Sequence, residues 1–122
     1  MDTQPLVTPQ VIQQSVNTIV QALSPEKIIV FGSCVREDIR WEGDLDLFVV
    51  MNTDLTFVDR ALEIRRLFEQ PPCPLDIIVY TPEEAAYWCQ VPSSFIYQIY
   101  AKGRSLYDRT AETVGQAVDS KS

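Results

Sequence analysis

Three short apolar runs constrain the fold of this chain more than any other feature. They are KIIVF at residues 27–31, LDLFVVM at residues 45–51 and LDIIVYT at residues 75–81. Each run is rich in β-branched residues and too short for a buried helix, so each is expected to form a strand. Because helical patterns lie between and around these runs, we predict one α/β domain with a small sheet of three or four strands and flanking helices.

Capping signals mark where the predicted helices begin and end. Thr8 and Pro9 open a first helix, which Ser24-Pro25 ends. A second, amphipathic helix is expected over residues 57–70, with these residues turned inward: Val58, Ala61, Leu62, Ile64 (in part), Leu67 and Phe68. Thr81, Pro82 and Glu84 predict a third helix that starts with a capping box. A fourth helix is expected over residues 92–103, ending at Gly103.

The remaining segments are shorter and more polar. Residues 34–38 are expected to form a short helix, residues 40–43 a loop and residues 105–107 a short last strand. Beyond Asp108 the chain turns polar. We therefore divide it into a single domain, residues 1–108, and a polar C-terminal tail, residues 109–122.

The composition argues against several classes of function. The 122 residues carry a net charge of −7, whereas a protein that binds nucleic acid directly usually shows a basic surface. The sequence contains no histidine. This excludes Ser-His-Asp and Cys-His catalytic groups and imidazole metal sites within the chain. Catalysis would have to use carboxylates, hydroxyls, backbone amides and metals bound through oxygen.

The expected location is the cytoplasm. No apolar run approaches the roughly 20 residues of a membrane span, so no membrane contact is predicted. The N-terminal segment MDTQPLVTPQ has neither the basic region nor the apolar core of a signal peptide. The cysteines Cys34, Cys73 and Cys89 are odd in number and lack metal-ligand spacing, so we interpret them as free thiols.

Two polar motifs interrupt the first two strand-like runs. Gly32-Ser33 ends the first run, and backbone amides after such a glycine can bind an anion, although a purely structural turn is the alternative. Asp44 and Asp46 head the second run at a spacing that places both side chains on one face. Like charges this close repel unless a cation lies between them, and oxygen ligands suit Mg²⁺. A turn at Asp44 and a solvated Asp46 remain the alternative.

Asp76 is the one charged residue inside the third apolar run. An aspartate within an apolar strand is unfavourable unless it is paired or bound. If this strand lies beside the second, Asp76 reaches the same site as Asp44 and Asp46. Three carboxylates around metal ions, facing a phosphate-binding turn, would form a site for phosphoryl or nucleotidyl transfer.

The complete pattern resembles a known family. Gly32-Ser33, ten residues, Asp44-x-Asp46 and the later Asp76 are similar to the minimal nucleotidyltransferase (MNT) domain of the DNA polymerase β-like superfamily, over about residues 8–108. The resemblance implies a polymerase β-like fold with a small mixed sheet. It implies that Gly32, Ser33 and Arg36 hold the nucleotide phosphates, that Asp44 and Asp46 bind Mg²⁺, and that Asp76 completes the metal site and activates the attacking hydroxyl.

Within the superfamily, the chain resembles the antitoxins of HEPN/MNT toxin–antitoxin modules. The resemblance implies an Mg²⁺-dependent protein adenylyltransferase, a type VII-like antitoxin that transfers AMP from ATP to a tyrosine of a partner HEPN ribonuclease. It also implies two Mg²⁺ ions as cofactors, ATP as substrate and a hetero-oligomer with the toxin. Two alternatives stay open: a non-catalytic antitoxin that acts by binding alone, and a nucleotidyltransferase that modifies a small molecule.

Some residues near these motifs carry weaker signals. The common family motif GSRARG is changed here at Cys34 and Glu37. Trp41 could stack on adenine, touch a partner or tuck against the sheet. Lys102 and Arg104 could meet phosphate, but a solvated helix end is the simpler interpretation. We interpret three aromatic residues as core and partner surface rather than as a platform for stacked bases: Phe95, Tyr97 and Tyr100.

Overall fold

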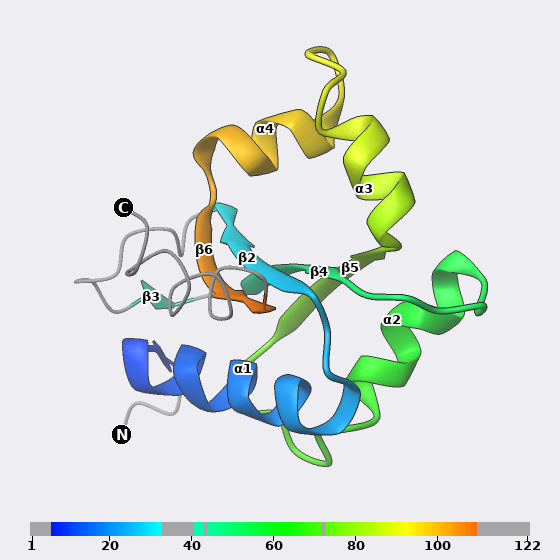
Figure 1. The fold of residues 1–122 in the computed structure, drawn as a ribbon. Coiled ribbons are helices and arrows are strands. Elements are labelled where there is room, and N and C mark those ends of the chain that lie inside the picture. Colours follow the sequence, from blue (N-terminus) through cyan, green and yellow to red (C-terminus); the bar gives the residue numbers. More distant parts are fainter. Residues whose placement is uncertain (1–5, 33–40, 43, 72, 110–122) are drawn as a thin grey trace, which may run out of the picture.

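A mixed four-stranded sheet forms the centre of the molecule (Figure 1). The computed structural model describes residues 6–32, 41–42, 44–71 and 73–109. The strand order is β5-β4-β2-β6, and the strands are β2 (Lys27–Phe31), β4 (Leu45–Val50), β5 (Leu75–Tyr80) and β6 (Arg104–Asp108). β4 runs parallel to β5 and antiparallel to β2, and β2 runs antiparallel to β6. The predicted α/β class and sheet size are confirmed.

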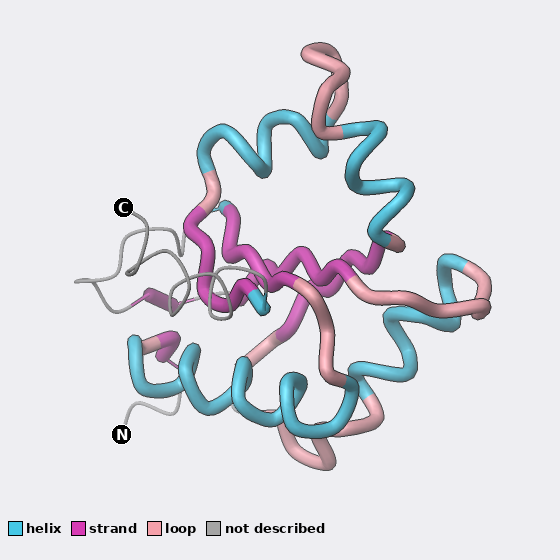
Figure 2. The backbone as a smooth tube through the Cα atoms, viewed as in Figure 1, coloured by secondary structure: helices cyan, strands magenta, loops and turns pink. Residues whose placement is uncertain are grey.

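Helices cover both faces of this sheet (Figures 1 and 2). Helices α1 (Pro9–Leu23) and α2 (Phe57–Arg65) lie on one side, and α3 (Pro82–Trp88) and α4 (Phe95–Lys102) lie on the other. Successive strand side chains alternate between the faces, so β2, β4 and β5 each contribute to two cores. The core under α1 and α2 includes Val30, Leu45, Leu47, Val49, Ile77 and Val79. The core under α3 and α4 is smaller and includes Ile29, Phe48, Val50, Ala85, Ile96 and Ile99.

The predicted helix caps are confirmed. The Thr8 hydroxyl accepts a hydrogen bond from the Val11 amide, and Pro9 opens α1. Thr81 and Glu84 form the full capping box of α3, since each side chain accepts a hydrogen bond from the other residue's amide. These local bonds satisfy amides that a helix start leaves unpaired. The helix starts were therefore fixed by short-range sequence.

Two expectations, one about a loop and one about the start of a helix, were wrong. Trp41 and Glu42, predicted as loop, form strand β3 (Trp41–Glu42), which pairs antiparallel with β1 (Leu6–Val7). A ladder this short depends on a segment far away in the sequence, so no local pattern marks it. The fourth helix was predicted from residue 92, but α4 begins at Phe95 because Ser94 caps it by accepting a hydrogen bond from the Tyr97 amide.

The inward face of the second helix was predicted wrongly only in part. α2 ends at Arg65, and Val58 and Leu62 are 66% and 38% exposed. Ile64, predicted to turn partly inward, is fully buried, and Arg60, one helical turn before it, also faces the sheet. Arg60 lies there because its guanidinium donates to the carbonyl of Val79 on the edge strand β5 and to Glu84. Beyond the helix, Leu67 and Phe68 pack against the core as predicted.

Several predictions fall outside the described residues. These are the short helix at residues 34–38, the thiol of Cys34 and nearly all of the tail, so the division at residue 108 stays a prediction. Cys89 is a free thiol, as predicted, and Cys73 is buried. Within the described part of the chain, no helix is both long enough and apolar enough to span a bilayer.

Candidate active site

Gly32 follows β2 and lies directly against Asp46 on β4. Its backbone has a φ of +77°, which side-chain-bearing residues rarely adopt. A Cβ atom at this position would collide with the Oδ2 atom of Asp46. Glycine therefore serves two purposes here: it lets the chain turn after the strand, and it leaves room for the carboxylate.

The sheet register brings the acidic residues together. Asp46 and Asp76 are direct partners in the parallel β4–β5 pair, so their side chains emerge from the same face. Asp44 lies two residues before Asp46, immediately before β4. Each of the three residues offers one carboxylate oxygen, and these oxygens lie within 4.8 Å of one another. The condition on which Asp76 was predicted to be part of the site, that the third strand lies beside the second, is met.

This crowding of negative charge changes the acidity of the central carboxyl. Burial, followed by the charges of Asp76 and then Asp44, raises the pKa of Asp46 to about 6. Asp46 is half-buried, whereas Asp44 and Asp76 are exposed. The arrangement is therefore unfavourable for three ionised carboxylates without a cation among them.

The three residues fit a divalent metal site. Carboxylate oxygens are the hard ligands that Mg²⁺ prefers, and Mg²⁺ typically takes one or two protein carboxylates together with substrate phosphates. Asp44, Asp46 and Asp76 would be the ligands. A bound cation would also offset the burial and the charge repulsion that together raise the pKa of Asp46.

One basic residue near the site was not anticipated from the sequence. Arg65, the last residue of α2, places its guanidinium 3.9 Å from Oδ1 of Asp76. Both side chains are well exposed, at 45% and 67%, so this ion pair is weak. The sequence shows Arg65 only as one of two adjacent arginines in a helix, and nothing in that pattern indicates where its side chain reaches.

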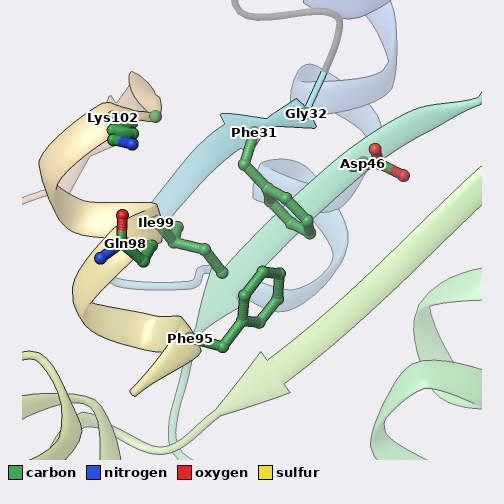
Figure 3. A pocket seen from close by; sticks show the side chains of 8 residues that line it. Phe31, Gly32, Asp46, Phe95, Gln98, Ile99 and Lys102 are labelled. Carbon is green, nitrogen blue, oxygen red and sulfur yellow. The ribbon is translucent and has the colours of Figure 1, made fainter. Parts of the chain in front are cut away.

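An apolar pocket beside Asp46 was also missed. It has a volume of about 490 Å³ and is lined by Phe31, Gly32, Asp46, Phe95, Gln98, Ile99, Lys102 and Gly103. Figure 3 shows the rings of Phe31 and Phe95 pointing toward one another, with Asp46 on the neighbouring strand. Phe31 and Asp46 are direct cross-strand partners, which explains why the pocket and the carboxylates share one face of the sheet. Of these residues, only Gly32 and Asp46 were predicted for the site and only Lys102 was considered as a phosphate contact, whereas Phe95 was interpreted as core and partner surface.

The structure thus brings together four of the six residues predicted for the site: Gly32, Asp44, Asp46 and Asp76. Ser33 and Arg36, predicted to hold phosphates, lie outside the described residues, as do Cys34 and Glu37. Trp41 is described only by its backbone in β3, so its predicted stacking stays a prediction.

The site thus consists of a glycine turn beside three clustered carboxylates on a small mixed sheet. Comparison with known protein families agrees with this arrangement. The family model described as polymerase beta, nucleotidyltransferase matches residues 13–112. The chain belongs to this nucleotidyltransferase family. The match covers both motifs and every described strand of the central sheet. No curated protein matches the chain.

Family membership supports nucleotidyl transfer as the general activity. Enzymes of this kind generally use a nucleoside triphosphate and a divalent metal, and the aspartate cluster could bind such a metal. The predicted polymerase β-like superfamily is therefore confirmed, whereas the narrower MNT antitoxin subfamily remains a matter for proposal.

Proposed function

We propose that this protein is an Mg²⁺-dependent protein adenylyltransferase that transfers AMP from ATP to a tyrosine of a partner HEPN ribonuclease, and thereby acts as an antitoxin. The observation that carries the proposal is the convergence of Asp44, Asp46 and Asp76 beside Gly32. A protein that acted by binding alone would have no use for three carboxylates whose oxygens lie within 4.8 Å of one another.

The reaction forms one bond and breaks one. The tyrosine oxygen attacks the α-phosphorus of ATP, the bond from this phosphorus to the bridging oxygen breaks, and pyrophosphate leaves. Asp76, which is 67% exposed, is accessible to an incoming hydroxyl and accepts its proton. Asp44, Asp46 and Asp76 would hold the divalent cations, whose charge would offset the negative charge that develops on the phosphates.

The surface around the site supports a protein as the acceptor. Four large apolar side chains of α3 and α4 are well exposed: Tyr87, Trp88, Phe95 and Tyr97. Tyr87 and Trp88 meet edge to face, with ring centroids 4.8 Å apart, and Phe95 lines the pocket beside Asp46. An exposed apolar side chain therefore lies at the site itself, where an acceptor protein would make contact.

The test is transfer of label from [α-³²P]ATP to a purified HEPN partner, with the modified residue identified by mass spectrometry. We expect one or more AMP groups on a tyrosine, dependence on Mg²⁺, and loss of label with EDTA. The double variant Asp44→Asn, Asp46→Asn should lose the transfer but still form the complex with the toxin. If the wild-type protein blocks the toxin in stoichiometric amounts without transferring label, the protein acts by contact alone.

Nucleotide binding supplies an independent test that needs no partner. ATP with Mg²⁺ should raise the free energy of unfolding by about 2.7 kcal/mol when the ligand is at 100 times its Kd, because it binds only the folded state. ATP or Mg²⁺ alone should have a much smaller effect. The absence of any thermal shift at millimolar MgATP would argue against a working site.

A further inference from the structure

The pocket beside Asp46 has the features of a ligand subsite. Its volume of about 490 Å³ falls within the range of small-molecule sites. It shares Gly32 and Asp46 with the candidate active site, so a ligand held by the carboxylates through a metal would extend into it. Phe95, which is 57% exposed, presents a large apolar ring at this position.

The pocket is lined by apolar side chains and by a few polar residues. Phe31 and Phe95 meet edge to face, with ring centroids 5.6 Å apart, and Ile99 packs beside them (Figure 3). Gln98 and Lys102, both exposed on α4, are among the lining residues. The Gln98 amide can donate and accept hydrogen bonds, whereas the Lys102 ammonium can only donate. Such a pocket suits a flat, largely apolar ring with polar groups at its edge.

We propose that this pocket binds the nucleobase of the nucleotide substrate, with Phe95 in contact with the ring and Gln98 selecting adenine. The inference rests on the proposed function, because it requires that the carboxylates hold a metal–nucleotide complex. An amide side chain pairs with adenine by accepting from its N6 amino group and donating to N7, a pattern that guanine does not offer. Lys102 lines the same pocket, and its ammonium group would attract the anionic part of the nucleotide.

The ring of an acceptor tyrosine fits the pocket less well than a base. A phenol carries one polar group, whereas the residues that line the pocket include both an amide, Gln98, and an amine, Lys102. A base, ribose and phosphate chain also forms one continuous ligand, and the pocket and the carboxylates are continuous through Asp46. Contact between a base and an aromatic side chain is moreover a favourable interaction in its own right.

The experiment compares two Mg²⁺-dependent ligands, ATP and inorganic tripolyphosphate, by isothermal titration calorimetry. Tripolyphosphate reports on the metal and phosphate site without a base. We expect Phe95→Ala to weaken ATP binding about tenfold and to leave tripolyphosphate binding unchanged. Gln98→Leu should abolish the preference for ATP over GTP. Phe95→Leu, which keeps an apolar side chain but removes the ring, serves as a second variant if Phe95→Ala does not fold.

Phe57 provides the matched control. It is 55% exposed and meets Tyr80 edge to face at 6.0 Å, so it resembles Phe95 in exposure and ring contact but lies outside the pocket. Phe57→Ala should leave the affinities for both ligands unchanged.

The possible failures are distinguishable. Wild-type protein that binds neither ligand would overturn the proposed function as well as this inference. Wild-type protein that binds ATP no more tightly than tripolyphosphate would overturn the base pocket alone. The base pocket would also be overturned if Phe95→Ala leaves the affinity for ATP intact, or weakens the binding of ATP and tripolyphosphate equally. If Phe95→Ala changes only the KM for the protein acceptor, the pocket binds the acceptor and not the base.

Discussion

The two faces of the central sheet differ in how completely helices cover them. On the face under α1 and α2, the odd-numbered residues of β4 are fully buried: Leu45, Leu47 and Val49. On the opposite face, α3 and α4 cover Phe48 and Val50 but leave Asp46 half-buried. The same six-residue strand thus contributes to a closed core on one side and to an open, charged site on the other.

Two arginines of α2 differ in the same way: Arg60, which is mostly buried, forms a structural ion pair, whereas Arg65 forms an exposed ion pair at the site. Arg60 is 11% exposed, pairs with Glu84 at 2.8 Å and also donates to two backbone carbonyls, so it joins α2 to α3 across the edge of the sheet. The hydrogen bond from Arg60, followed by that from the Thr81 amide, lowers the pKa of Glu84. Arg65 instead reaches Asp76 only at 3.9 Å with both groups exposed. The Arg60–Glu84 pair therefore stabilises the packing of α2 against α3, whereas the Arg65–Asp76 pair leaves Asp76 accessible.

The largest effect should come from Asp76 on the open face. Asp76→Asn keeps the size of the side chain but removes the proton acceptor and one metal ligand. We expect AMP transfer to fall by roughly 10²–10⁴-fold, with the fold unchanged. The measurement is labelled AMP incorporation, with thermal unfolding of the same samples. Asp54→Asn, an exposed substitution away from the cluster, is the control. A fall of less than about tenfold would remove Asp76 from the catalytic role.

A loss of stability is expected instead at Leu47, which follows Asp46 in β4 but lies on the face covered by α1 and α2. Leu47→Ala removes a fully buried side chain and should lower the free energy of unfolding by about 2–5 kcal/mol. Denaturant titration measures this loss. Leu55→Ala, at a residue that is 39% exposed, should have a much smaller effect. Similar losses for the two variants would mean that the closed face is less tightly packed than the structure shows.

Gly32→Ala tests whether the open face depends on the room that glycine leaves. The new Cβ would meet Oδ2 of Asp46, and the backbone φ of +77° is unfavourable for alanine by about 1–2 kcal/mol. We expect a loss of stability of that order and weaker Mg²⁺-dependent ATP binding, because Asp46 must move. Calorimetry and thermal unfolding measure both. Retention of wild-type ATP affinity would show that Asp46 does not need its present position.

The smallest effect concerns pH and the charge on Asp46. Its pKa is raised to about 6, so the folded state holds this proton more tightly than the unfolded chain does. The metal-free protein should therefore lose stability as the pH rises from about 4 to 6, by no more than about 1 kcal/mol after solvent screening. Asp46→Asn should remove this fall.

The metal should reverse that trend, because binding requires the ionised carboxylate. Stabilisation by Mg²⁺ is expected to be small at pH 5 and larger at pH 8. Thermal unfolding with and without Mg²⁺ at both values makes the comparison. Equal stabilisation at both pH values would mean that Asp46 is not a ligand.

Much of the fold could be predicted from the sequence because its signals are local. The apolar runs marked β2, β4 and β5, and hydroxyl and proline residues marked the starts of α1 and α3. The β1–β3 ladder was missed because pairing between distant residues leaves no local signal. Ile64 was correctly placed on the inward face of α2, but Val58 was not, because Arg60, with three hydrogen-bond partners, lies against the sheet where hydrophobic periodicity predicted Val58.

In the candidate site, too, some features could be predicted from the sequence and others could not. By itself, the sequence determined which residue types are available for chemistry: a Gly-Ser turn, three aspartates in or beside strands, and no histidine. Only the tertiary structure decided that β4 and β5 are parallel neighbours with Asp46 opposite Asp76, that Gly32 makes room for Asp46, and that α4 completes a pocket with Phe31. The physical reason is that spacing along a strand fixes which face a side chain takes, whereas the distance between strands depends on how the whole chain packs.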